Sequence, residues 1–113
     1  MRNHNEYLNY LLPNNWCAEE DMDNLLLYNP NGNGAMTISF FNVLNTEKSL
    51  DEQISILAKR FIDKNNIDLQ SPLVLFNREG KTILYGTGTT SESWFIKLWV
   101  VAKFPKIVFS TYQ

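Results

Sequence analysis

Residues 49–66, SLDEQISILAKRFIDKNN, decide the fold because they predict one long helix in a chain otherwise rich in strand patterns. Ser49 and Glu52 have the spacing of a capping box, in which the serine hydroxyl accepts a hydrogen bond from the Glu52 amide. Asn65 and Asn66 tolerate the left-handed conformation that closes a helix. Between them, apolar residues recur at helical spacing: Leu50, Ile54, Leu57, Ala58, Phe61 and Ile62. We expect a helix over about 49–65 that lies across one face of a sheet.

Turn residues divide the rest of the chain into short apolar runs, among which we count about seven strands. These runs lie at 7–12, 16–20, 25–28, 35–44, 73–77, 81–86, 94–103 and 106–112. Residues 35–44 carry apolar groups on both faces at period two, which favours a central strand. Most connections are too short for a parallel crossover, so neighbouring strands pair antiparallel. The predicted fold class is therefore α+β: a single antiparallel sheet of about seven strands with one main helix packed on one face.

Length and charge set the broad class of protein. The chain has 113 residues, which is enough for a single domain spanning 1–113. Its net charge of −2 argues against a nucleic-acid partner, since domains that bind nucleic acids are normally basic. No apolar run is long enough to cross a membrane, and the N-terminus has no hydrophobic stretch of the kind that a secretory signal needs. We therefore expect a cytoplasmic protein with no membrane association.

Histidine and cysteine are too scarce for most catalytic or metal sites. The chain has one residue of each type, His4 and Cys17. His4 lies among the first residues, where positions are poorly fixed, so Cys17 lacks a base to form its thiolate. Zinc sites built on His and Cys take about three or four ligands, which this chain cannot supply. We expect no enzyme activity, no catalytic residue, no metal site and no cofactor.

Two segments rich in glycine or asparagine match ligand loops only in part. Residues 29–34 open with the spacing of a calcium loop, but Phe40 stands where that loop requires a bidentate glutamate. A hairpin loop is the better interpretation. The segment that contains Gly86 and Gly88 has neither the lysine of a phosphate loop nor the helix that follows such a loop. We interpret 86–93 as a polar loop at the end of a strand.

Two groups of residues are candidates for contact with a partner. The first is an acidic stretch formed by Glu19, Glu20, Asp21 and Asp23. It would suit a basic partner or a weakly bound cation, although a solvated bend is the commoner explanation of such a run. The second is formed by Phe95, Lys97 and Trp99, which share one parity of the last long strand. Aromatic anchors with lysine charge can form a binding surface, and the alternative is a half-covered sheet face whose lysines extend into solvent.

Several packing and turn motifs together resemble those of a known fold. They are Leu12-Pro13-Asn14-Asn15-Trp16, Leu27-Tyr28-Asn29-Pro30-Asn31-Gly32, Ala35-Met36-Thr37-Ile38-Ser39 and the Trp-rich run at 94–103. These motifs resemble the PsbP-like/Mog-like fold, and most closely small uncharacterised bacterial proteins of that fold. The resemblance implies an antiparallel sheet backed by helices that acts through protein contacts, and some bacterial members look like immunity proteins paired with toxins. Relatives often continue into a C-terminal helix, so this chain either covers its sheet differently or leaves a face open for a partner or a second copy.

The expected function is that of a non-enzymatic protein-binding domain, and its specific form is an immunity-type protein that caps a partner toxin. The sequence is also compatible with a homodimer. The alternative is a small apolar-ligand carrier with a pocket between helix and sheet. Such a carrier should contain a closed apolar cavity on the order of a few hundred Å³.

Overall fold

The computed structural model describes residues 2–4, 8–10, 12–21, 23–32, 34–43 and 47–113. Within these residues there are one helix and ten strands, and every strand pairing is antiparallel. Strands β1 (Arg2–His4) and β2 (Leu8–Tyr10) form a hairpin of their own, whereas the other eight strands form one sheet. The predicted α+β class, with an antiparallel sheet and one main helix, is confirmed.

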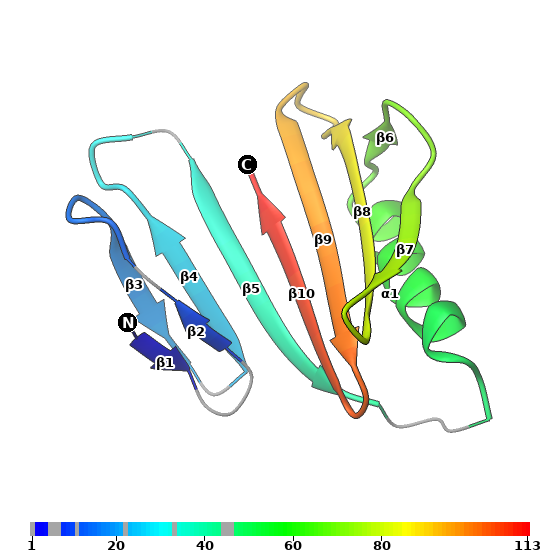
Figure 1. Cartoon of the computed structure of the whole chain (residues 1–113). Helices are drawn as coiled ribbons and strands as arrows, with labels where there is room; N and C mark the ends of the chain where they lie inside the picture. Colours follow the sequence, from blue (N-terminus) through cyan, green and yellow to red (C-terminus); the bar gives the residue numbers. More distant parts are fainter. Residues whose placement is uncertain (1, 5–7, 11, 22, 33, 44–46) are drawn as a thin grey trace.

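The large sheet has the order β3-β4-β5-β10-β9-β8, and both β6 and β7 pair with the outer edge of β8 (Figure 1). The strands are β3 (Cys17–Glu20), β4 (Asn24–Tyr28), β5 (Ala35–Asn42), β6 (Asp68–Leu69), β7 (Val74–Arg78), β8 (Lys81–Thr89), β9 (Phe95–Lys103) and β10 (Lys106–Tyr112). Because β5 lies between β4 and β10, the central position predicted for it is confirmed.

The helix α1 (Leu50–Lys64) begins and ends where the sequence predicts. The Ser49 hydroxyl accepts a hydrogen bond from the Glu52 amide at 3.1 Å, which satisfies one of the free donors of the first turn. At the other end the Asn65 side-chain amide donates to the Phe61 carbonyl at 2.9 Å, and Asn66 adopts a φ of 52°. The left-handed residue turns the chain away from the helix axis and toward β6.

The first hydrophobic core lies between α1 and strands β8, β9 and β10. Its fully buried members come from all four elements: Ile54, Ala58, Leu84, Leu98, Val100, Ala102, Ile107 and Phe109. Figure 1 shows α1 beside the β8 end of the sheet, far from β3 and β4. The helix therefore covers one face of the sheet, but only over its C-terminal strands.

The second core lies on the opposite face and at the other end of the sheet. It contains Leu25 and Leu27 of β4 with Ile38 and Phe40 of β5. Leu25 pairs with Ile38 across β4 and β5, so their side chains share a face, and that face points away from α1. Residues of the N-terminal segment, including Trp16, pack on this core. The two cores are thus diagonal to one another, on opposite faces and toward opposite ends of the sheet.

The expectation of a polar loop over 86–93 is wrong for 86–89, because β8 continues as a strand to Thr89, whereas 90–93 do form the connection to β9. The two glycines allow this extension by making room for the segment that pairs with the edge of β8. A Cβ atom on Gly88 would lie 2.5 Å from the Asp68 carbonyl oxygen, and one on Gly86 would lie 2.5 Å from the Leu73 Cδ2 atom. The glycines that suggested a loop are therefore needed for close packing within the sheet.

Candidate functional site

Strands β7, β8 and β9 expose one face that no other element of the described chain covers. Cross-strand pairing places Phe95 opposite Thr89 and Trp99 opposite Tyr85, on the side that points away from α1. Phe95 is 48% exposed, whereas its neighbour Ile96, which points toward α1, is 1% exposed. The structure thus brings Phe95, Lys97 and Trp99 together on one face, as their parity predicts.

We call this surface the open face and define it by outward residues of the three strands: Val74, Phe76, Ile83, Tyr85, Thr87, Thr89, Phe95, Lys97, Trp99 and Val101. Four of its apolar side chains are more than a third exposed, and the rest are half-buried. The rings of Phe76 and Tyr85 meet edge to face, with centroids 6.2 Å apart. The apolar side chains are contiguous over β7, β8 and the Trp99–Val101 part of β9, and Lys97 and Thr87 separate them from Phe95. Exposed apolar surface of this kind on a protein generally marks an interaction site.

The open face contains one lysine, Lys97, whose ammonium group contacts an aromatic ring of the same face. The Lys97 Nζ atom lies over the Trp99 ring, 5.6 Å from its centroid. This distance is typical of a cation–π contact, in which the ring face attracts the ammonium group. The contact places a positive charge beside Trp99, between the apolar residues of the three strands and Phe95.

Four further cations form a line along one end of the open face. Arg78 pairs with Lys81 across β7 and β8, and Lys103 pairs with Lys106 across β9 and β10. All four have the outward parity of the open face, and we call them the cation row. The outward strand positions of β7–β10 include no carboxylate. The strand positions of this face are therefore positive in a chain whose net charge is −2, and the nearest carboxylate in sequence is that of Glu79, in the turn between Arg78 and Lys81.

The predicted acidic residues lie at the opposite edge of the sheet and do not form one patch. Glu19 and Glu20 belong to β3, where alternation directs their side chains to opposite faces. Asp21 and Asp23 follow in the connection to β4, where the Asp21 amide donates to the Asn24 carbonyl at 2.9 Å. Glu19 accepts a hydrogen bond from the Tyr28 hydroxyl at 3.1 Å, and this bond raises the pKa of Tyr28.

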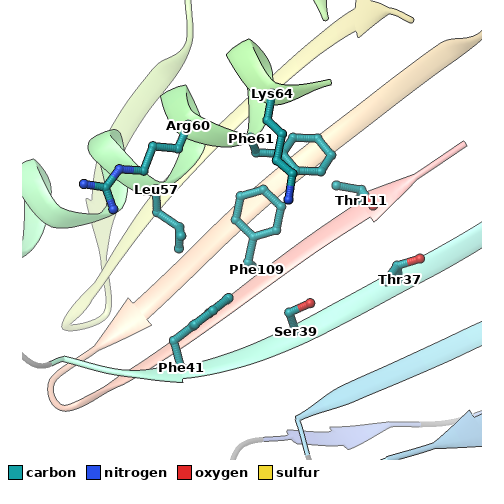
Figure 2. A pocket seen from close by; sticks show the side chains of 9 residues that line it. All are labelled: Thr37, Ser39, Phe41, Leu57, Arg60, Phe61, Lys64, Phe109 and Thr111. Atoms are coloured by element: carbon teal, nitrogen blue, oxygen red, sulfur yellow. The ribbon is translucent and has the colours of Figure 1, made fainter. Parts of the chain in front are cut away.

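A groove lies between α1 and β5, in the region where the alternative function places a pocket between helix and sheet. It has a volume of about 240 Å³ and an apolar floor made by Phe41, Leu57, Phe61 and Phe109. The rings of Phe61 and Phe109 pack with their centroids 5.1 Å apart. Figure 2 shows that the floor side chains come from the helix above and from two adjacent strands below.

This groove differs from the closed cavity expected of an apolar-ligand carrier. The space directly beneath α1 is filled, since Ile54 and Ala58 are fully buried there. The groove lies instead beside the helix, and Phe41 in its floor is 40% exposed. The alternation of 35–44 places Thr37, Ser39 and Phe41 on the face that the groove uses, but it does not show that α1 lies beside them.

The chain was compared with family models, with curated proteins and with solved structures, and none of these comparisons finds a match. The resemblance to the PsbP-like/Mog-like fold therefore stays a prediction. In the described part of the chain, no three His, Cys, Asp or Glu residues are grouped so that they could hold a metal ion. No helix in that part combines the length and the apolar character that crossing a bilayer requires.

Proposed function

We propose that the protein is a non-enzymatic binding domain of the cytoplasm whose open face and cation row bind an acidic protein. The observation that carries this proposal is the uncovered apolar face of β7–β9 with cations and no carboxylate at its outward positions. Protein interfaces are typically built this way, with aromatic anchors at the centre and charged groups at the rim. An immunity-type protein that caps a toxin is the specific form we expect.

The packing of the aromatic rings favours a protein over a single-stranded nucleic acid as the partner. Bases bind by stacking on exposed ring faces. Here Phe76 and Tyr85 pack edge to face, and Lys97 lies over the face of Trp99. Of the exposed aromatic residues on the open face, Phe95 alone has no ring or cation contact among the described residues. The rings therefore suit apolar side chains of a folded partner better than a run of stacked bases.

The acidic residues of β3 and its following turn remain a second predicted contact. They lie at the far edge of the sheet from β8, so they cannot extend the open face. A partner that used both surfaces would have to reach across β4, β5 and β10. We therefore assign the main contact to the open face.

A photo-crosslinking amino acid at position 95 tests the proposal. The cells that natively make the protein would express a variant in which the crosslinking amino acid replaces Phe95. As a control, they would express a second variant in which it replaces Glu52, an exposed residue of α1. We expect one acidic protein to crosslink through position 95 and not through position 52. The purified partner should then bind in a salt-dependent manner, because the cation row supplies much of the attraction.

Charge reversal in the cation row gives the quantitative part of the test. The double variant Lys81→Glu with Lys103→Glu should weaken binding of the crosslinked partner by about tenfold or more. Substitution of Lys59→Glu on α1, away from this face, should leave the affinity unchanged. Crosslinking to a nucleic acid, to a basic protein or equally from both positions would contradict the proposal.

A further inference from the structure

The groove between α1 and β5 lies on the opposite side of the sheet from the open face and carries its own chemistry. We propose that it binds an amphipathic carboxylate, with the apolar chain along the groove floor and the carboxylate at Lys64 and Thr111. This site goes beyond the protein-binding function proposed above, because it uses none of the residues of the open face. The argument rests on where the apolar, hydroxyl and cationic groups lie along the groove.

The apolar part of the groove suits a linear chain. Phe41, Leu57 and Phe109 line its centre. A second hollow of about 270 Å³ shares Phe41, Leu57 and Arg60 with it and continues to Ile56 and Ile107. The two hollows therefore form one path along α1, and together they reach the size of about 300–1,000 Å³ that is usual for small-molecule sites.

The polar groups gather at the other end of this path. Figure 2 shows the Lys64 side chain running from α1 down toward the sheet, near Thr111, while Arg60 extends along the helix toward the other end of the groove. Lys64 and Arg60 are four residues apart, so both lie on the groove side of α1. No carboxylate lines the groove or the adjoining hollow, so an anion would meet only positive charge there.

Thr111 gives a second, independent indication of a ligand. Its side chain lines the groove but is only 9% exposed. Within the described residues its hydroxyl has no hydrogen-bond partner, whereas the nearby Ser39 hydroxyl donates to the Asn24 side-chain oxygen at 2.8 Å. A buried hydroxyl without a partner is unfavourable, and a carboxylate oxygen beside Lys64 would accept its hydrogen bond.

Decanoate at submicellar concentration is the probe for this site, and decan-1-ol is its uncharged counterpart. Binding would be followed by calorimetry and by amide NMR. We expect saturable decanoate binding that shifts the resonances of Phe61, Phe109 and Thr111. We expect Lys64→Gln to weaken decanoate binding by about tenfold, as is typical for the loss of a charge-assisted hydrogen bond. The same substitution should leave decan-1-ol binding unchanged.

A matched control separates the groove from the general charge of the helix. Lys59 is an exposed cation of α1 that lines neither hollow, so Lys59→Gln should bind decanoate like the unmodified protein. Thr111→Val, which keeps the side-chain shape, should weaken binding as well. Equal losses in the Lys59 and Lys64 variants, equal affinity for decan-1-ol, or shifts confined to Tyr85 and Trp99 would overturn the proposal. None of these results would affect the crosslinking test of the open face.

Discussion

The two parts of the sheet that no other element covers differ in the side chains that they expose. The open face presents aromatic rings that already contact one another, with a row of cations at one end. The uncovered part of the helix face presents a concave groove with an apolar floor and a buried hydroxyl. A surface spanning three strands with cations along one end suits a protein, whereas a groove with one polar end suits a small amphiphile.

The difference has one structural origin. A single helix of 15 residues is too small to cover one whole face of an eight-stranded sheet. Because α1 packs on β8–β10, it leaves β5 uncovered on its own side, and the N-terminal segment packs on the opposite face at the other end. Both the open face and the uncovered part of the helix face therefore expose apolar side chains that a complete two-layer domain would bury.

Loss of side-chain volume should lower the free energy of unfolding much more on the covered face of β9 than on its open face. Val100 is fully buried under α1, and its neighbour Val101 is half-buried on the open face. We expect Val100→Ala to lower the free energy of unfolding by about 2–3 kcal/mol, since it removes buried methyl groups and leaves a cavity. Val101→Ala should cost less than about 1 kcal/mol. Urea denaturation of both variants measures the difference, and equal losses would mean that the open face is covered in solution.

Substitutions of Gly86 and Gly88 test how closely the neighbouring segment packs against the edge of β8. A Cβ atom on Gly88 meets the backbone oxygen of Asp68, which cannot move without disturbing β6, whereas one on Gly86 meets the flexible end of the Leu73 side chain. We expect Gly88→Ala to lower the free energy of unfolding by about 1–2 kcal/mol, and Gly86→Ala by clearly less. Thermal unfolding would rank the two variants. The reverse order would show that β6 does not approach β8 as closely as the structure has it.

These glycines also show where sequence patterns stop being sufficient. The capping box at Ser49 and the alternation of 94–103 depend on neighbours in the chain, and both were predicted correctly. The strand at Gly86 and Gly88 depends on the approach of Asp68 and Leu73, which are not local in sequence, so it was interpreted as a loop. The groove likewise joins a helix to two strands. Contacts between distant segments create such sites, and periodicity in one segment does not reveal them.

The cation row should lower stability slightly, in contrast to the groove, where Lys64 and Arg60 stand apart from one another. Arg78 and Lys81 are directly opposite across β7 and β8, and like charges in that arrangement repel. We expect Lys81→Gln to raise the free energy of unfolding by about 0.2–0.5 kcal/mol at low salt. The gain should vanish at about 1 M salt, where screening acts within about 3 Å. A gain that persists at high salt, or a matching gain in Lys59→Gln, would argue against repulsion within the row.

The smallest effect concerns Tyr28, which shares its face of the sheet with the groove. Its hydroxyl donates to the Glu19 carboxylate, and this bond, together with the Glu19 charge, raises the pKa of Tyr28 above its ordinary value of 10.0. A raised pKa means that the folded protein holds this proton more tightly than the unfolded chain does. The stabilisation is therefore complete below the ordinary pKa and is lost as the pH rises through the raised one.

We expect Tyr28→Phe to remove this alkaline component from the pH dependence of stability, and Glu19→Gln to reduce it, because glutamine has no charge but keeps an acceptor oxygen. Glu20→Gln should retain it, because the register directs Glu20 to the opposite face. The measurement is the free energy of unfolding from pH 8 to pH 11, together with phenolate absorbance in the folded protein. If Glu20→Gln reduced the component and Glu19→Gln did not, the register of β3 would be shifted by one residue. Every side chain of that strand would then exchange faces, and Glu20 rather than Glu19 would lie on the groove side of the sheet.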